Sequence, residues 1–456
     1  MRHMSLSRRR FLGVGASGLA TATAVGCDLR LGSDEPRSGQ RRSLSEFVDA
    51  LPPLTRPGSI SDADWASIRS RFILEPQVAY MNNASLGMPP APVALAVANG
   101  YEAISREPLH GKHDLQDTIA QRVLPSLARA VGADIDEVSL TRNATEALHL
   151  AAVGIDLGPG DEVLVTSQEH PAGLAPWDFV AATRGVMINT VFIPSPFESG
   201  DHVVERMAEA LTPRTRVMAF CHVTRGGHLY PVKKLAALAR DRGVLSHVDG
   251  AQALGMFPVD VHDLGCDSYS ASLHKWLLGP IGTGMLYVRG GARESIRSAF
   301  ARIHRGGDTP SGIPGSASPV ASAFAPHGPG GTADLPVRAG LAAALDQLEV
   351  LGVENVAART RFLSDQLKAG LGDLPGVTLL SGPTPETSCP GSTIFELAGV
   401  DAVEAVPRIE AIANIHLDEH QRDGHNAIRI STHVYNTTEE VHRVLEGLRQ
   451  LASSAG

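Results

Sequence analysis

Residues 243–252 read Gly-Val-Leu-Ser-His-Val-Asp-Gly-Ala-Gln, a short apolar run that ends in a carboxylate. The run over residues 245–248 predicts a buried strand, and Asp249 follows directly at its carboxyl end. In a mostly parallel sheet, ligands bind at the carboxyl ends of the strands. A buried strand that ends in aspartate therefore indicates that a cation lies beside it.

A second segment, residues 270–276, reads Ser-Ala-Ser-Leu-His-Lys-Trp and places Lys275 between an expected strand and the turn-rich residues 279–284. A lysine with apolar neighbours has a depressed pKa and a usable neutral amine. Candidates for lysine chemistry are few, because the chain has only five lysines: Lys112, Lys233, Lys234, Lys275 and Lys368.

Short β-branched runs alternate with amphipathic helical stretches along the chain. Strands are expected at 138–141, 162–166, 187–193, 216–220, 245–248, 268–270 and 283–288, and helices between them at 144–153, 177–184, 202–211 and 233–242. This alternation predicts an α/β fold, with a mostly parallel sheet covered on both faces by helices. A length of 456 residues favours two domains. A long Ala- and Leu-rich helix near residues 334–351 leaves the first domain, and an α+β unit follows it.

Composition narrows the function classes. Hydrophobic residues make up 43% and charged residues 20% of the chain, which is typical of a globular protein. The net charge is -9 and no block of like charge occurs, which argues against a nucleic-acid partner. No CxxC pairing occurs, so neither a zinc ribbon nor a disulfide framework is expected among Cys27, Cys221, Cys266 and Cys389.

The N-terminus reads as a targeting segment. Residues 7–12, Ser-Arg-Arg-Arg-Phe-Leu, begin a run of small residues that is too short to span a bilayer stably, and together they resemble a twin-arginine (Tat) export signal. Two processing routes stay open: residues 22–24, Ala-Thr-Ala, fit a cleavage site, whereas residues 24–27, Ala-Val-Gly-Cys, fit a lipobox whose Cys27 would carry lipid. We expect the Tat translocase as a partner and a periplasmic location, with a membrane anchor if Cys27 is lipidated.

The motifs around Asp249 and Lys275 resemble those of the pyridoxal 5'-phosphate (PLP) enzymes of aminotransferase class V, the group with the cysteine desulfurases and isopenicillin N epimerase-like proteins. Further motifs follow in the family's order at residues 80–87, 141–148, 168–171, 330–332 and 428–436. The resemblance implies PLP fold type I, the aspartate aminotransferase-like fold. Together with the N-terminal targeting segment, it predicts these segments: signal peptide 1–27, flexible linker 28–45, a segment 46–95 joining the small domain, a large PLP-binding domain 96–345 and a small C-terminal domain 346–456.

The resemblance also implies how the cofactor PLP is held. Lys275 would be the Schiff-base lysine and the proton carrier at the substrate α-carbon. Asp249 would pair with the pyridinium nitrogen, Gln252 would hydrogen-bond the phenolic oxygen, and His170 would stack on the ring. The phosphate would be bound at a helix N-terminus by the amide of Ala144 and by the side chains of Thr145, Ser272 and His274.

Substrate and subunit contacts follow from the same resemblance. Arg429 would take the substrate α-carboxylate bidentately, with Asn83 as a further candidate for that carboxylate. Gly331 and Thr332 would come from the neighbouring subunit of a homodimer with shared active sites.

Structural roles compete with these functional ones. Thr145 could be a plain N-cap, Asp249 a member of a structural ion pair, Arg429 a surface residue on a strand, and His170 a loop histidine. Three histidines, His416, His420 and His425, have spacings that could bind metal. No acidic HExxH pattern accompanies them, and we predict no metal site.

The reaction is the least defined point. A desulfurase needs a cysteine on a loop shortly before the carboxylate-binding arginine, and residues 416–426 contain none; Cys389 reads as structural. Arg225 departs from the small polar residues of the relatives, and it either binds an acidic side chain of the substrate or faces solvent.

We therefore expect transamination or tailoring of an amino acid or peptide-borne amino acid. An epimerase or an α,β-lyase is the alternative, and a PLP-binding protein without turnover is the non-enzyme class. The Tat route moves folded proteins, which suits an enzyme that binds its cofactor in the cytoplasm. In this respect the chain resembles the exported PLP enzymes that tailor pyoverdine siderophores.

Overall fold

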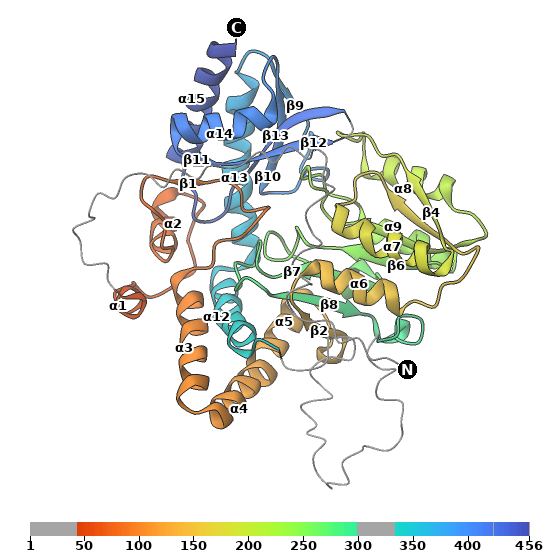
Figure 1. The fold of residues 1–456 in the computed structure, drawn as a ribbon. Coiled ribbons are helices and arrows are strands. Elements are labelled where there is room, and N and C mark those ends of the chain that lie inside the picture. Colours follow the sequence, from red (N-terminus) through yellow and green to blue (C-terminus); the bar gives the residue numbers. More distant parts are fainter. Residues whose placement is uncertain (1–42, 299–332, 423, 456) are drawn as a thin grey trace, which may run out of the picture. The chain divides into compact units, whose positions relative to one another are not determined.

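The computed structural model describes residues 43–298, 333–422 and 424–455 (Figure 1). The predicted signal peptide with Cys27 and most of the predicted linker lie outside these residues. Helix α1 (Leu44–Asp49) begins within the last two residues of that linker. It starts there because Ser43 and Glu46 form a capping box.

The central sheet has seven strands in the order β2-β8-β7-β6-β5-β3-β4. Only β8 runs antiparallel to its neighbours, so the sheet is mostly parallel, as predicted. The bounds are β2 (Val138–Thr141), β3 (Glu162–Thr166), β4 (Met187–Val191), β5 (Thr215–Cys221), β6 (Leu245–Asp249), β7 (Ser268–Ser272) and β8 (Gly284–Val288).

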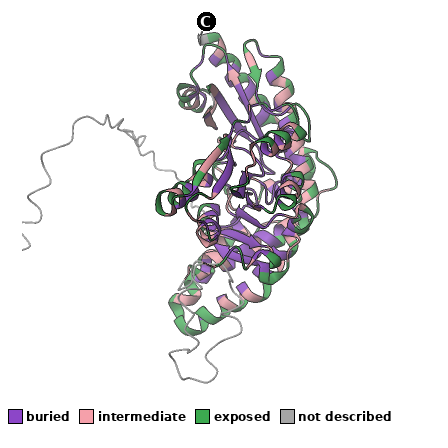
Figure 2. Ribbon diagram, turned by 90° about the vertical axis from the view of Figure 1, so that its right-hand side faces the viewer, coloured by how far each residue is buried: buried purple, intermediate pink, exposed green. Residues whose placement is uncertain are grey.

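Helices cover both faces of this sheet, and the alternation of side chains along each strand divides them between two cores. In β3, Val163 and Val165 pack in one core with α6 (Ala144–Gly154) and α7 (Pro171–Arg184), whereas Leu164 packs in the other. That second core includes α5 (Leu124–Val131), α8 (Gly200–Ala210), α9 (Val232–Asp241) and α12 (Leu335–Leu351). Apart from the edge strand β4, the sheet is buried between these layers (Figure 2).

The C-terminal residues form a four-stranded antiparallel sheet in the order β12-β13-β10-β9. Its strands are β9 (Val377–Leu379), β10 (Ser392–Leu397), β12 (Asp418–Arg422) and β13 (His425–Ser431). A third core packs against it, from α13 (Val353–Gly372), α14 (Ala402–Ala413) and α15 (Thr438–Ala455). Strand β1 (Ala79–Tyr80) pairs in parallel with β11 (Ile415–His416), which agrees with an N-terminal segment that joins the small domain. The domain boundaries themselves stay predictions.

The other α-helices of the described residues are α2 (Asp62–Arg69), α3 (Ala91–Arg106), α4 (Pro108–Thr118) and the short α10 (Val261–Leu264). Helix α7 begins six residues earlier than the predicted start at 177, because Pro171 is tolerated in a first helical turn and His170 caps it. In the described part of the chain, no helix is both long and apolar enough to cross a membrane.

Candidate active site

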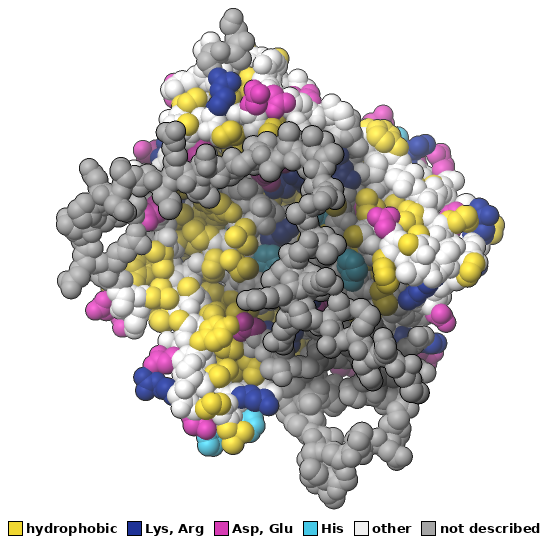
Figure 3. Space-filling view, in the orientation of Figure 1, with side chains coloured by type: hydrophobic (Ala, Val, Ile, Leu, Met, Phe, Trp, Pro, Cys, Tyr) yellow, Lys and Arg dark blue, Asp and Glu magenta, His cyan; other side chains and the backbone are white. Residues whose placement is uncertain are grey.

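The functional side chains gather where the parallel strands of the central sheet end. Cys221, Asp249 and Ser270 are register partners on β5, β6 and β7, so the carboxyl ends of these strands lie level. The loops after β2, β3 and β7 leave the same edge and carry the helix α6 N-terminus, His170 and Lys275. Lys, Arg and His side chains are visible near the centre of the face drawn in Figure 3.

Lys275 sits in a tightly bonded loop after β7. The amide of Leu273 donates to the carbonyl of Thr283 at 3.0 Å, and that of Leu278 donates to the carbonyl of Lys275 at 3.3 Å. The segment after β1 closes over this loop, since the amide of Gly87 donates to the carbonyl of His274 at 2.9 Å. A Cβ at position 87 would lie only 1.9 Å from the Lys275 carbonyl oxygen, so this approach requires glycine.

Burial lowers the pKa of Lys275 to about 8. Asp249 acts in the opposite direction, and the positive charges of Arg429 and Arg225 lower the Lys275 pKa further. The expected depressed pKa is confirmed, and a substantial fraction of the amine is neutral near pH 7 to 8. A neutral amine is the form that attacks a carbonyl or accepts a proton.

Asp249 is buried, and burial raises the pKa of its carboxyl while Lys275 lowers it. Its Oδ1 accepts a hydrogen bond from the amide of Ala251 at 2.9 Å. Among the described residues, no Lys, Arg or His lies within ion-pair distance of Asp249, which argues against a structural ion pair. A buried carboxylate in this position fits a cationic group of a ligand, such as a protonated ring nitrogen.

His170 caps helix α7, and its Nδ1 accepts a hydrogen bond from the amide of Ala172 at 3.1 Å. This bond assigns the ring proton to Nε2. Partial desolvation, followed by the charges of Lys275 and Arg225, lowers the His170 pKa to about 4, so the imidazole is neutral. The His170 residue is also solvent-exposed, which leaves its ring available for stacking on a planar ligand.

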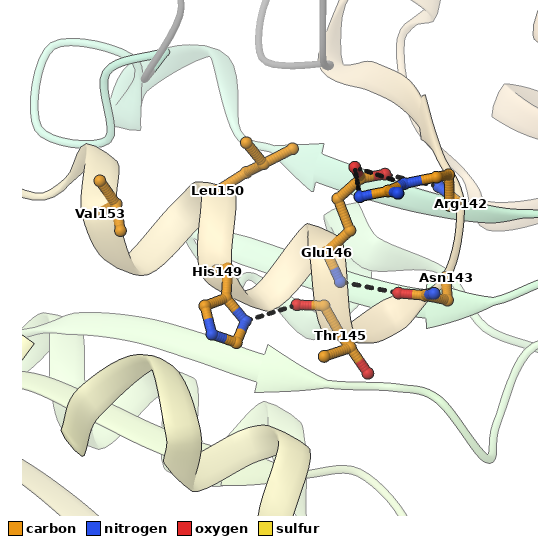
Figure 4. Close-up of a pocket in the computed structure, with 7 residues that line it drawn as sticks. All are labelled: Arg142, Asn143, Thr145, Glu146, His149, Leu150 and Val153. Atoms are coloured by element: carbon orange, nitrogen blue, oxygen red, sulfur yellow. Dashed lines mark hydrogen bonds and ion pairs between the residues drawn. The ribbon is translucent and has the colours of Figure 1, made fainter. Parts of the chain in front are cut away.

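The N-terminus of α6 meets the end of β7. The side chain that caps α6 belongs to Asn143, whose Oδ1 accepts from the amide of Glu146 at 2.8 Å, so Thr145 is not the N-cap. The amide of Ala144 donates to Oγ of Ser272 at 3.3 Å. Amide, hydroxyl and helix dipole together suit a phosphate. Thr145 lines a hollow of about 500 Å³ along α6, together with Arg142, Glu146 and His149 (Figure 4).

His274 and Gln252 are both partly engaged by the protein. His274 Nδ1 contacts the carbonyl of Thr283 at 2.9 Å, which leaves its Nε2 for a ligand. Gln252 donates from Nε2 to the carbonyl of Ala84 at 2.8 Å and accepts at Oε1 from Trp276 at 2.7 Å. One N–H of the Gln252 amide remains to donate to a ligand oxygen.

Arg429 is buried on β13 and forms an ion pair with Asp418, so it is not the surface residue of the competing interpretation. Its Nη2 lies 3.4 Å from Oδ1 of Asn82. Asn83 Oδ1 accepts a hydrogen bond from the Tyr435 hydroxyl at 2.9 Å, and its buried Nδ2 has no hydrogen-bond partner. The structure thus brings Asn82 to the guanidinium, and the role of Asn83 as a donor to the substrate carboxylate stays a prediction.

Arg225 lies inside the site. Its Nη2 contacts the Glu419 carbonyl oxygen at 3.2 Å and Oε1 at 3.3 Å, and its side chain is 27% exposed. Its charge lowers the pKa of Lys275 and of His170, which locates Arg225 near the reactive amine. Solvent is therefore not its main environment.

Two residues of the site were missed from the sequence. Glu169 is buried beside Asp249: a Cβ built on Gly173 would lie 3.4 Å from Asp249 Oδ2 and 3.8 Å from Glu169 Oε2. Burial raises the Glu169 pKa to about 8. Arg422 on β12 binds the carbonyls of the loop that carries His170. In the sequence, the only signal for Glu169 was its position directly before His170, a histidine of a family motif. No signal in the sequence pointed to Arg422.

The other candidates have different outcomes. Gly331 and Thr332 lie outside the described residues. Among the described residues, the only group with metal-like spacing is Asp134, Glu137 and His262, which does not include the three histidines of residues 416–425. Cys389 is buried and its pKa is raised, as befits a structural thiol.

The fold and the site define a PLP-dependent enzyme of fold type I. Aminotransferase class-V features match residues 79–444, and the chain belongs to this family. It is 30% identical over 398 residues to isopenicillin N epimerase of Streptomyces clavuligerus, covering 85% of this chain and 98% of the relative. It is 26% identical to a probable cysteine desulfurase of Methanothermobacter thermautotrophicus, covering 82% and 94%.

Solved structures of PLP enzymes share the fold of this chain. The cystine C-S lyase C-DES, in complex with cysteine persulfide, superposes with a TM-score of 0.73 at 25% identity, covering 82% of this chain and 98% of that one. A C-DES mutant with glycine covalently linked to its PLP cofactor gives 0.74, covering 84% and 98%. PLP is accordingly the cofactor. The chain offers a partner for each part of it: Lys275 for the aldehyde, Asp249 for the ring nitrogen, His170 for the ring face and the N-terminus of α6 for the phosphate.

Proposed function

We propose that the protein transfers or tailors the amino group of an amino acid, free or within a peptide, with Lys275 as the sole base. Bound PLP supplies an electron-withdrawing ring that makes the α-hydrogen of an attached amino acid acidic. The amine of Lys275 then takes this proton and returns it, and Arg429 orients the substrate through its carboxylate.

The single observation behind this choice is the set of charged groups that act on Lys275. They are Asp249, which is expected to pair with the ring nitrogen, and two arginines, Arg429 and Arg225, so Lys275 is the one member of this group that we propose as a base. The Nδ1 lone pair of His170 is occupied by the amide of Ala172, and its pKa of about 4 makes it a poor proton acceptor. A single base on one face of the substrate α-carbon suffices for transamination. Inversion of the α-carbon, in contrast, is easiest with a second proton donor on its opposite face.

Epimerisation is the second candidate. It is favoured by the 30% and 32% identity to the isopenicillin N epimerases of Streptomyces clavuligerus and Amycolatopsis lactamdurans, each covered over 98% of its length. Desulfuration is disfavoured, because residues 416–422 and 424–426 form strands β12 and β13 and their approaches, without a cysteine.

The test begins with the purified, PLP-loaded chain and single amino donors in deuterium oxide. Transamination yields a 2-oxo acid and leaves the cofactor as pyridoxamine phosphate. Recovery of the D-isomer with deuterium at the α-carbon would instead support the epimerase, and release of pyruvate with ammonia or sulfide would support a lyase. A colourless protein that borohydride does not label at Lys275 would contradict the whole assignment.

We further propose export by the Tat route and a homodimer with shared sites. The support is residues 7–12 for export and the family resemblance of residues 330–332 for the dimer. Replacing Arg8 and Arg9 by lysine should retain the holoenzyme in the cytoplasm. Mass spectrometry of the mature N-terminus separates a lipidated Cys27 from cleavage after residue 24. Mixing Lys275→Ala with Thr332→Ala subunits should restore activity only if one subunit completes the other's site.

A further inference from the structure

We propose that the substrate carries two carboxylates, one bound by Arg429 and the other by Arg225. It would be an acidic amino acid, or a peptide with an acidic side chain at the reacting residue. The inference rests on the proposed function, since it names the substrate class of the same site.

The first support is the way one strand holds both arginines. Asp418 and Glu419 are consecutive residues on β12, whose Cα atoms are therefore about 3.8 Å apart. Asp418 forms the ion pair with Arg429, and Glu419 contacts Arg225 through its carbonyl oxygen at 3.2 Å and its carboxylate at 3.3 Å. Because β12 is an edge strand, its outer side is open to Arg225. Two guanidinium groups thus flank one strand, each beside a carboxylate of the protein itself.

The second support is their common position beside the reactive amine. Arg225 follows β5, whose last residue, Cys221, is the register partner of Asp249. Arg225 and Arg429 each lower the pKa of Lys275 and of His170, and Arg225 also lowers that of Arg429. An α-carbon next to Lys275 therefore has a guanidinium available for its own carboxylate and another for its side chain.

The third support is a pair of buried polar atoms without hydrogen-bond partners. Arg422, the third guanidinium of this cluster, is already engaged, because it donates to the carbonyls of Ser167 and Glu169. By contrast, Arg429 Nε and His420 Nδ1 are buried without a hydrogen-bond partner, in residues that are 4% and 2% exposed. Buried polar atoms without partners are costly, and they favour a ligand that supplies acceptors.

Exchange of carboxylates would cost little at Arg225. The Glu419 side chain is 39% exposed, so it can return to water when an incoming carboxylate replaces it. A planar guanidinium accommodates that carboxylate bidentately. A neutral side chain offers Arg225 no carboxylate, so the site favours substrates with a second carboxylate over monocarboxylates.

Binding of simple acids tests the two-carboxylate site without any turnover. Calorimetry on the PLP-loaded chain would compare glutarate and adipate with butyrate, which has one carboxylate. We expect the better dicarboxylate to bind at least about tenfold more tightly than butyrate. Arg225→Gln should abolish this preference, whereas Arg216→Gln, on strand β5 before Arg225 and 50% exposed, should preserve it. Equal affinities, or a preference that survives Arg225→Gln, would overturn the inference.

Amino acids extend the test to the reaction itself. L-glutamate and L-2-aminoadipate should be used in preference to L-glutamine and L-norleucine, and Arg225→Gln should reverse or remove that order through KM. Failure of the two proposals is distinguishable. If borohydride labels Lys275 but glutamate and glutamine react alike, only the two-carboxylate inference fails. If Lys275 is not labelled, the proposed function fails, while the glutarate–butyrate comparison can still be measured.

Discussion

The Arg422 guanidinium donates two hydrogen bonds to the carbonyl of Ser167, from Nε at 3.1 Å and from Nη2 at 2.6 Å. The same Nη2 also contacts the carbonyl of Glu169. These bonds tie the edge strand of the C-terminal sheet to the loop after β3, which carries His170. His170, the expected partner of the cofactor ring, follows a strand of the central sheet. It is thus positioned by Arg422, which belongs to the C-terminal sheet.

Removing this tie should loosen the His170 loop. We expect Arg422→Gln to lower the free energy of unfolding by about 1 to 3 kcal/mol, because carbonyl groups lose charge-assisted donors. PLP should also dissociate faster. Urea unfolding and the release rate of PLP measure the two effects, with the exposed Arg216→Gln as control. Unchanged PLP release in Arg422→Gln would show that the tie is not needed to position His170.

Glu169 should make stability depend on pH. Its pKa is about 8 in the folded protein, whereas an unfolded glutamate titrates at about 4.3. The folded state keeps a proton that the unfolded state releases, so the free energy of unfolding should fall as pH rises from about 4.5 to 8, by an amount on the order of a few kcal/mol.

The variant Glu169→Gln removes this titration while keeping an acceptor for the Thr166 hydroxyl, which now donates to Glu169 at 2.6 Å. Its stability should decline less than that of the parent chain between pH 5 and 8 in urea unfolding. The exposed Glu446→Gln is the control and should follow the parent curve. Parallel curves for Glu169→Gln and the parent would refute a raised pKa at Glu169.

Gly87 should tolerate no side chain. An added Cβ would meet the Lys275 carbonyl at 1.9 Å, so Gly87→Ala must displace the loop that carries the reactive amine. We expect a loss of about 1 to 3 kcal/mol in stability, together with weaker PLP binding. Gly158→Ala, with open space around position 158, is the matched control for both measurements. Normal PLP binding by Gly87→Ala would mean that the Lys275 loop is not held by this contact.

Lys275→Ala should abolish covalent attachment of PLP and lower turnover by about 10³-fold or more. The chain should still fold, because a buried ammonium is replaced by an apolar group. Borohydride labelling followed by peptide mapping, together with circular dichroism, separates the two effects. Lys233→Ala removes an exposed lysine paired with Asp263 and should retain both labelling and activity. Labelling at any lysine other than Lys275 would contradict the assignment.

Local patterns predicted most of the framework. Strands β2 and β3 lie where their β-branched runs predict, because alternation and apolar content are properties of consecutive residues. The position of Asp249 at the end of β6 follows from the same local reasoning. The start of α7 was harder to place, since proline is compatible with both a loop and a first helical turn.

The site depended more on contacts between distant segments. Asn82, which had no predicted role, reaches Arg429, because the turn after β1 decides which of two adjacent amides faces β13. From the sequence the role of Arg225 was open between substrate and solvent, and only the structure shows that its side chain contacts Glu419 and is 27% exposed. No spacing in the sequence encodes such a contact.

The sequence by itself determined the succession of strands along the chain. It also determined that a single lysine, Lys275, follows a strand of the central sheet, and to which family its motifs point. Only the tertiary structure decided that Glu169 lies against Asp249, that Arg225 and Arg429 act on Lys275, and that Arg422 binds the loop that carries His170. The physical reason is range: backbone propensity and side-chain periodicity act over a few residues. Burial, charge clustering and pKa shifts arise only when segments far apart in the chain pack together.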